Sequence, residues 1–263
     1  MKTPVHIITL ATATARRAFQ QRQALRLDFS PIWHRAMGVD DFGDDIHFEN
    51  AFSWQRPLKK TEVGCFLSHF KIWEKVAFGF GPIVILEDDV VLSDGWGEVI
   101  DELATLKDVD CINLEAVGKK QVGKSRQIGR WCIKRMYLNS SGAGAYLLWP
   151  SGAQKLVARY AQEGAALADA FINEAKEFEV WQLDPAIVIQ MCMLPYYGLP
   201  AMEEGVSQIA REQFASPTPS NLALRVKMKW RRIKGEIQKG VRRLGVLVGH
   251  QRKYISYLHH HRF

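Results

Sequence analysis

Residues 81–92 read GPIVILEDDVVL, an apolar run that three consecutive acids, Glu87, Asp88 and Asp89, interrupt. The residues just before them, 83–86, are all apolar, which is typical of a central strand buried on both faces of an α/β sheet. An unpaired carboxylate is costly to bury, so acids at the end of such a strand require a positive partner. This stretch therefore predicts a buried strand with a binding site at its carboxyl end.

The direction of the three side chains narrows the kind of partner. Successive side chains of a strand point to opposite faces, so we expect Glu87 and Asp89 to share one face and Asp88 to occupy the other. Ligands of open α/β sheets collect outside the carboxyl ends of the strands. Carboxylate and phosphate oxygens together suit a divalent cation, so the pair predicts a metal bound to a phosphorylated ligand. The alternative is a solvated acidic turn that binds nothing.

Composition describes a globular protein without a membrane span. With 263 residues, 47% of them hydrophobic, the chain can bury a full core. The apolar run at residues 5–10 is too short for a secretory signal, and no run reaches the roughly 18 residues of a spanning helix. We expect reduced thiols and a cytoplasmic location, because the cysteines are dispersed without CxxC or metal-binding spacing. They are Cys65, Cys111, Cys132 and Cys192.

Charge divides the chain into two parts. Residues 221–263 hold twelve Lys or Arg and one acid, Glu236, so this segment has a charge of +11. Since the whole chain has a net charge of +7, the other 220 residues together carry −4. The stretch SPTPS at 216–220 reads as a linker. We therefore predict a globular domain at 1–215, a linker at 216–220 and a basic tail at 221–263.

The tail has the pattern of an interfacial helix. Its apolar residues fall at helical intervals among the cations, which predicts an amphipathic helix that binds an anionic membrane surface. They are Trp230, Ile233, Ile237, Val241, Leu244 and Leu247. A solvated extension is the alternative. Nucleic acid would also attract such charge, but the acidic body carries no matching motif, so we expect no nucleic-acid partner.

Strand and helix patterns alternate along the body. Residues 5–10, 83–86, 111–114 and 178–183 read as strands, and residues 144–149 as a strand that ends at Pro150. Helical spacing is found over 61–77, where apolar residues recur every three or four positions, and the composition of 13–27 is helical. This alternation predicts an α/β fold with a mostly parallel central sheet flanked by helices.

Two of these stretches together resemble a known family. TEVGCFLSHFKIWEKV at 61–76, followed by IVILEDDVVL at 83–92, is similar to glycosyltransferase family 25, the bacterial lipopolysaccharide and lipooligosaccharide galactosyltransferases, whose domain also occurs in collagen galactosyltransferases. HIITLATATARR, RAMGVD and SGAGAYLLWPSGAQKL resemble further segments, so the likeness covers about residues 4–195. The chain departs from the family pattern at Thr9-Leu10, where Asn-Leu is usual, and at Lys60-Thr61, where a Gly is common.

The resemblance implies a GT-A like fold and an activity. It implies inverting transfer of a hexose, galactose from UDP-galactose, to a lipopolysaccharide or lipooligosaccharide saccharide. UDP-glucose as donor, or a catalytically inactive sugar-nucleotide-binding protein, are the alternatives. It also implies Mn²⁺ or Mg²⁺ held by Asp89 and Glu87. A lipid-linked oligosaccharide acceptor would place the enzyme at the cytoplasmic face of the inner membrane.

Donor-binding residues follow from the same resemblance. Thr9 lies in the opening loop, and Arg16 and Arg17 follow it, where a guanidinium could bind the diphosphate through two hydrogen bonds; the alternative for the arginines is an exposed helix face. Asp40 is expected at the base or ribose, or is a turn residue. His69, beside Ser68, lines the site or is a buried structural histidine.

The remaining candidates are residues expected to contact the transferred sugar or to accept the proton of the acceptor hydroxyl. Asp88 is expected to contact sugar hydroxyls or a backbone amide. Inversion requires a general base, for which Asp169 is the candidate, with a helix N-cap as its alternative role. Reserve candidates for the base are Asp110, Glu115 and Asp184. Gly142 and Gly144, before Tyr146, would allow the backbone to approach a sugar closely or would serve strand packing.

Overall fold

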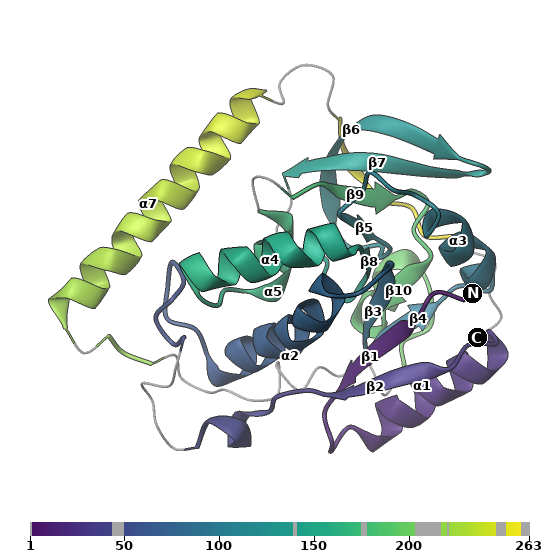
Figure 1. Ribbon diagram of the computed structural model, residues 1–263, viewed down its shortest axis with the longest axis horizontal. Helices are drawn as coiled ribbons and strands as arrows, with labels where there is room; N and C mark the ends of the chain where they lie inside the picture. The colour runs from purple at the N-terminus through teal and green to yellow at the C-terminus, as the bar shows by residue number, and fades with distance from the viewer. Residues whose placement is uncertain are drawn as a thin grey trace.

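A nine-stranded sheet organises the protein (Figure 1). The computed structural model describes residues 2–43, 50–138, 141–174, 178–202, 217–219, 221–245 and 251–258. The strand order is β11-β6-β7-β9-β5-β8-β3-β1-β2. The strands are β1 (Val5–Thr9), β2 (Pro31–Arg35), β3 (Ile83–Glu87), β5 (Cys111–Asn113), β6 (Lys119–Ile128), β7 (Trp131–Leu138), β8 (Ala145–Leu148), β9 (Val180–Leu183) and β11 (Gln251–Tyr254). A second sheet pairs β4 (Val90–Leu92) with β10 (Val188–Gln190).

The α/β class is confirmed, but the prediction of a mostly parallel sheet is wrong. Only β1-β2, β1-β3 and β5-β9 run parallel, and the other five neighbouring pairs are antiparallel. One cause is the β6–β7 hairpin, which turns at Gly129. The other is β8, which returns between β3 and β5 in the opposite direction. Antiparallel pairs need only short connections, so an alternation of strands and helices alone does not exclude them.

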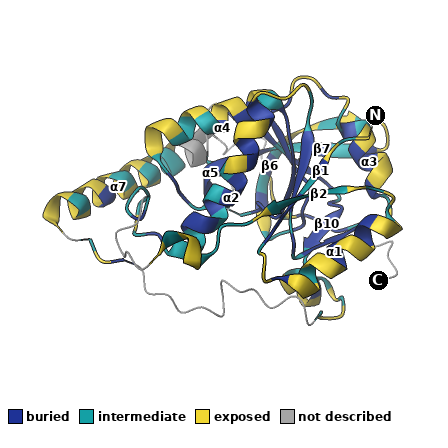
Figure 2. Ribbon diagram, turned by 60° about the horizontal axis from the view of Figure 1, so that its bottom comes forward, coloured by how far each residue is buried: buried dark blue, intermediate teal, exposed yellow. Residues whose placement is uncertain are grey.

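Helices cover both faces of the sheet. They are α1 (Thr14–Arg26), α2 (Lys60–Ala77), α3 (Trp96–Leu103), α4 (Pro150–Glu163), α5 (Ala168–Asn173) and α7 (Leu222–Gly245), with 3₁₀ turns η1 (Val39–Phe42) and η2 (Met191–Tyr197). One core cluster joins α2, α4 and α5 through Phe66, Leu156 and Phe171. The other lies under α3 through Trp96 and Leu103. The central strands β3, β5 and β8 between them are buried, whereas β2, β6 and β11 toward the two edges are partly exposed (Figure 2).

Strand β3 contributes to both clusters because its side chains alternate. Ile85 belongs to the first cluster, and Val84 and Leu86 belong to the second; all three are fully buried. This arrangement confirms the central buried strand that the apolar run predicts. The acids that follow Leu86 therefore lie at the end of a strand that both core clusters hold in place.

Helix α2 brings a second segment to the same edge of the sheet. It confirms the helix predicted at 61–77, with Lys59 as N-cap and Glu62 accepting a hydrogen bond from the Lys59 backbone N–H at 2.9 Å. A Cβ on Gly64 would lie 2.4 Å from the carbonyl oxygen of Met37, so only glycine allows the chain after β2 to pass this close. The Met37 N–H also donates to Ser68 Oγ at 2.8 Å. The segment that leads to η1 is thus fixed against α2.

The basic segment is divided between a helix and the sheet. Helix α7 confirms the predicted helix, and it lies against the body, where Arg231 donates to the Phe52 carbonyl at 2.8 Å and Lys239 pairs with Glu174 at 3.2 Å. Strand β11 pairs with β6, and the Ile255 that follows it is fully buried. This differs from the predicted tail, which treated residues 221–263 as one unit. No helix among the described residues has the length and apolar character to cross a bilayer.

Candidate active site

A pocket of about 250 Å³ opens at the carboxyl ends of β1 and β3. Its walls are the loop after β1, the η1 segment, one face of α2 and the three acids that follow β3. Seven predicted residues line it, namely Thr9, Arg16, Asp40, His69, Glu87, Asp88 and Asp89. The parallel pairing of β1 with β3 brings these segments together from distant parts of the sequence, as the rule for α/β sheets predicts.

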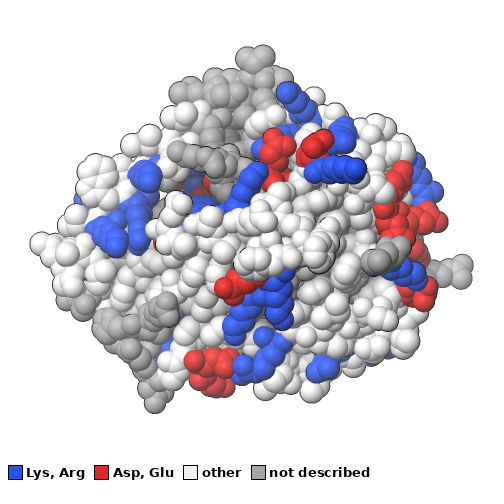
Figure 3. All heavy atoms as spheres, in the orientation of Figure 1, with Lys and Arg blue, Asp and Glu red and all other residues white. Residues whose placement is uncertain are grey.

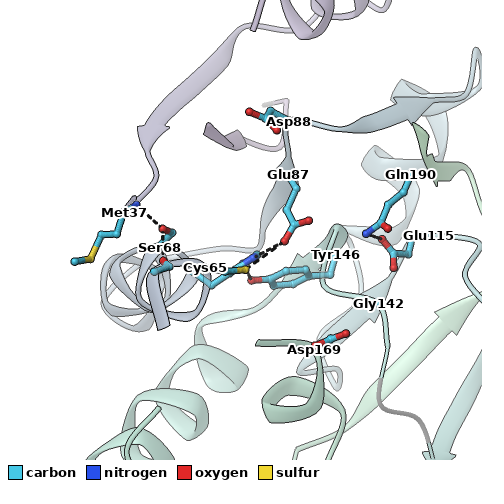
Figure 4. A network of polar contacts seen from close by, with 12 residues as sticks. Met37, Cys65, Ser68, Glu87, Asp88, Glu115, Gly142, Tyr146, Asp169 and Gln190 are labelled. Carbon is cyan, nitrogen blue, oxygen red and sulfur yellow. Dashed lines mark hydrogen bonds and ion pairs between the residues drawn. The ribbon is translucent and has the colours of Figure 1, made fainter. Parts of the chain in front are cut away.

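Asp88 is held on the α1 side of the pocket. It accepts a hydrogen bond from the Thr9 hydroxyl at 2.7 Å and pairs with Arg16 at 3.1 Å. Burial raises the pKa of Asp88 above its usual value, and the contacts with Thr9 and Arg16 oppose that rise. Figure 4 shows Asp88 turned away from Glu87, as alternation along the strand predicts. Asp88 therefore positions Arg16 at the pocket wall.

Glu87 ends a chain of hydrogen bonds that runs into the core. The Trp73 indole N–H donates to the Tyr146 hydroxyl at 2.8 Å, which lies 2.9 Å from His69 Nδ1, and His69 Nε2 lies 3.2 Å from Glu87 Oε1. An indole can only donate, so a Tyr146 hydroxyl that donates to Nδ1 leaves the proton of neutral His69 on Nε2, facing Glu87. Burial would raise the pKa of Glu87, but the hydrogen bonds from His69 and Cys65 hold it below its usual value.

The pKa of Asp89 lies above its usual value, in contrast to that of Glu87. Burial, followed by repulsion from Glu87, raises the pKa of Asp89 to about 7. Its Oδ1 atom is buried and has no hydrogen-bond partner among the described residues. An unpaired buried carboxylate oxygen beside a second carboxylate is what a bound cation would stabilise. These residues therefore fit the divalent ion that the sequence predicts.

A softer donor set lies beside this pair. Cys65, His69 and Glu87 have ligand atoms within 4.8 Å of one another, and the Cys65 Sγ lies 3.7 Å from Glu87 Oε1. Sulfur and imidazole ligands suit Zn²⁺, whereas Asp89 with Glu87 suits Mg²⁺ or Mn²⁺. Glu87 belongs to both sets. Burial, and then the charge of Glu87, raise the pKa of the Cys65 thiol well above its usual value, which disfavours the thiolate that a metal would need.

Asp169 lies in the first turn of α5 and is not among the residues that line the pocket. The N-cap of this helix is Leu167, so Asp169 lies one residue inside the helix and is not the cap. Its Oδ1 accepts a hydrogen bond from the Ala170 N–H at 3.2 Å. Burial, and then the charge of Glu87, raise the pKa of Asp169 above its usual value. Figure 4 shows Asp169 on the far side of Tyr146 from Glu87.

Three of the remaining candidates lie elsewhere. The guanidinium of Arg17 stacks on the Trp33 ring at 4.8 Å, outside the pocket. Asp110 is buried and accepts hydrogen bonds from Ser151 and Lys155 at 2.9 and 2.7 Å. Asp184 binds a lysine of β7 and a lysine of β11, each at 2.6 Å. Both acids have the bonding of structural anchors.

Glu115 is the reserve candidate that follows a strand ending at the same edge of the sheet as β3. It follows the apolar strand β5 just as Glu87 ends β3, so the same sequence signal marks both acids. Because β5 and β3 each pair antiparallel with β8, they run in the same direction and their carboxyl ends lie at one edge. Cys65 lines the pocket but was not predicted as a site residue, since a thiol among apolar neighbours gives no signal in the sequence.

The family description "Glycosyltransferase family 25 (LPS biosynthesis protein)" matches residues 2–172. The chain belongs to glycosyltransferase family 25. A putative glycosyltransferase of Haemophilus influenzae is 25% identical over 190 residues, 67% of this chain and 64% of that relative. The lipooligosaccharide biosynthesis protein lex-1 of the same species is 30% identical over 154 residues, 51% of each chain.

Not every relative is named as active. The probable inactive glycosyltransferase 25 family member 3 of Rattus norvegicus is 36% identical over 110 residues, 39% of this chain and 19% of the rat protein. This family 25 chain therefore spans less than two thirds of each of the relatives described. The family match at residues 2–172 includes all the residues that line the pocket.

Proposed function

We propose that this family 25 protein transfers a hexose, galactose from UDP-galactose, to a lipopolysaccharide or lipooligosaccharide saccharide with inversion at the anomeric carbon. The observation that carries the proposal is the pocket beyond β1 and β3, where Arg16 and the acids Glu87, Asp88 and Asp89 line one cavity. The negative charge of a nucleotide diphosphate requires positive partners. Arg16 supplies one directly, and the pair Glu87 and Asp89 can supply a second by holding a metal ion. The mixed sheet with this site at its edge is consistent with a GT-A like domain.

The residues of the pocket divide into binding roles. Asp89, with Glu87, would hold Mn²⁺ or Mg²⁺, which supplies charge neutralisation to the departing diphosphate. Arg16 lies at the pocket wall and can donate to a phosphate oxygen. Asp40 is exposed at the opposite wall, on η1, where a ribose hydroxyl or a base can reach it. His69 orients Glu87 through their hydrogen bond.

Proton transfer is assigned to Asp169. In an inverting reaction an acceptor hydroxyl attacks the anomeric carbon, its proton passes to the base, and the bond from that carbon to the diphosphate oxygen breaks on the opposite side. A base needs a raised pKa to hold the proton it receives. Burial gives Asp169 such a shift, while its exposed part keeps it accessible to an acceptor.

One experiment tests the proposal and its alternatives together. UDP, UDP-galactose and UDP-glucose are titrated calorimetrically with and without Mn²⁺, and release of free hexose is then measured for each donor. The proposal requires metal-dependent binding and turnover of UDP-galactose. Faster turnover of UDP-glucose would assign the other donor, binding without turnover would assign an inactive sugar-nucleotide-binding protein, and no binding would refute the proposal.

We further propose that α7 holds the enzyme on an anionic membrane at the cytoplasmic face, where a lipid-linked acceptor resides. Its inward side contacts the body through Met228 and Arg231. Its outward side exposes apolar residues at intervals of three or four, from 43% to 75% of their surface, namely Leu222, Val226, Trp230, Ile233, Ile237 and Val241. Figure 3 shows Lys and Arg beside uncharged side chains where α7 runs in Figure 1. Apolar burial and attraction to anionic lipids together support such binding.

A further inference from the structure

A buried polar cluster lies beside the pocket and takes no part in the roles described above. Glu115 and Lys120 have no exposed surface, and Glu115 Oε1 has no hydrogen-bond partner among the described residues. The Asn173 Oδ1 atom nearby is likewise buried without a partner. The Asn173 amide and the Lys120 ammonium donate to the same carbonyl, that of Ser141. Acceptor atoms left unmatched in this way are costly unless a donor reaches them.

Two glycines shape this cluster. Gly142 has φ +108°, which favours glycine, and a Cβ there would lie 2.9 Å from Lys120 Nζ and 3.1 Å from Glu115 Oε1. A Cβ on Gly144 would lie 2.4 Å from Glu115 Oε2 and 2.7 Å from Gln190 Nε2. The bare backbone at the start of β8 is therefore what allows the charged and amide groups to gather. The SGAGAY stretch thus serves the packing of polar side chains around Glu115.

Gln190 lies between this cluster and the surface. Its amide lies 3.5 Å from Glu115 Oε2, at the limit of hydrogen-bond length, and it also accepts a hydrogen bond from the exposed Cys192 at 3.7 Å. Figure 4 shows the Gln190 and Glu115 side chains directed at each other. Such a long contact is weak, so a hydroxyl can replace it at little cost. Gln190 is half-buried, which makes it the accessible member of the pair.

We infer that Glu115 and Gln190 bind hydroxyl groups of the hexose being transferred and determine which hexose is accepted. This inference rests on the proposed function, because it needs a nucleotide sugar in the adjoining pocket. The sheet places Glu115 at the same edge as Glu87, so a sugar joined to a diphosphate near Asp89 extends toward the cluster. A carboxylate that accepts beside an amide that donates is complementary to two neighbouring hydroxyls. Lys120 opposes the rise that burial causes in the pKa of Glu115, and Asn113 fixes the Glu115 backbone by accepting from its N–H at 2.9 Å.

The test compares UDP, which lacks the sugar, with UDP-hexoses. Hydrogen bonds to charged groups contribute about 1.5–3 kcal/mol, or roughly a 10- to 150-fold change in affinity. Above about pH 8, where Glu115 is ionised, Glu115→Gln should therefore weaken calorimetric binding of the preferred UDP-hexose at least about tenfold, leave UDP binding within about twofold, and reduce discrimination between UDP-galactose and UDP-glucose. Gln190→Ala should produce a smaller loss in the same direction. Asp110→Asn, at a buried acid that lies outside the site, is the matched control and should change neither affinity.

The outcomes separate the inference from the proposed function. A wild-type protein that binds neither UDP nor any UDP-hexose refutes the proposed function. A wild-type protein that binds UDP-hexose no more tightly than UDP, or a Glu115→Gln variant that keeps the wild-type preference, refutes the inference alone. Thermal melting at neutral pH controls for folding: because burial raises the pKa of Glu115 to about 8, glutamine replaces a mostly protonated side chain of similar size, and the variant should melt close to wild type.

Discussion

Replacing Ile255 with alanine should destabilise the whole protein, although this residue lies in the segment whose charge predicts a separate tail. Ile255 is fully buried and belongs to the same cluster as Phe66 and Phe171 of α2 and α5. Tyr197 of η2 also donates a hydrogen bond to the Ile255 carbonyl at 3.0 Å. The side chain is thus part of the core that supports the site.

The magnitude follows from the burial. The substitution removes three carbons, each worth about 0.8 kcal/mol when fully buried, so the loss of transfer free energy is about 2.4 kcal/mol. The cavity adds to this value, and isoleucine-to-alanine changes in cores cost about 2–5 kcal/mol in total. With a urea dependence of about 3 kcal/mol per molar, the unfolding midpoint should fall by roughly 1 M.

Equilibrium urea unfolding, followed by tryptophan fluorescence and by circular dichroism, measures this shift. Val241→Ala is the matched control, because this branched residue of α7 is 64% exposed and its loss should change stability by less than about 0.5 kcal/mol. Equal midpoints for Ile255→Ala and wild type would refute the core position of Ile255. Equal decreases in the urea midpoint for Ile255→Ala and Val241→Ala would show that α7 and the segment that contains β11 and Ile255 contribute to stability as one unit.

Four further outcomes are expected. Asp89→Asn should lower turnover at least about 100-fold and abolish its dependence on Mn²⁺, and full activity after exhaustive chelation would contradict this role. Asp169→Asn should lower turnover about 10²- to 10⁴-fold with UDP-donor affinity unchanged, whereas a loss of affinity alone would indicate a binding role. Trp230→Ser combined with Ile237→Ser should reduce flotation with anionic vesicles at least about tenfold without lowering the melting temperature. Flotation of the wild type should weaken as salt concentration rises. Equal flotation of the double variant and the wild type would exclude α7 as the anchor. Because burial raises the pKa of Glu115 to about 8, its contribution to stability should be present below about pH 4.5 and be lost as pH rises toward 8, so Glu115→Gln should flatten the fall in urea midpoint between pH 5 and 8.

Sequence reasoning found the elements whose own residues carry an unambiguous pattern. The apolar run of β3 and the three- to four-residue spacing of α2 each predict one structure, and their acids and histidine lie in the pocket as expected. Strand β6 reads KKQVGKSRQI and has no apolar run, so nothing local predicts it. It forms because β7 and β11 complete its hydrogen bonds, and the full burial of Lys120 depends on Ser141 and Glu115.

The roles of the acids were harder to predict than their positions. Asp110, Glu115 and Asp184 all lie next to strands, and all are buried. Lysines from other elements reach Asp110 and Asp184 and make them anchors, whereas Glu115 keeps an oxygen without a hydrogen-bond partner. That difference depends on side chains far away in the sequence. An acid after an apolar strand is therefore a candidate whose role only the tertiary partners decide.

The pairing of β11 with β6 also sets an order of assembly during synthesis. Gln251 of β11 pairs with Val122 of β6. During synthesis β6 therefore leaves the ribosome long before β11 does, and its outer edge stays unpaired in the meantime. Contacts of such wide separation in the sequence form late, and an unpaired edge in the meantime invites association between nascent chains. Lysine on an open strand discourages that association. The charges of Lys119 and Lys124, which weaken β6 as a strand in isolation, would then protect the polypeptide until β11 is synthesised.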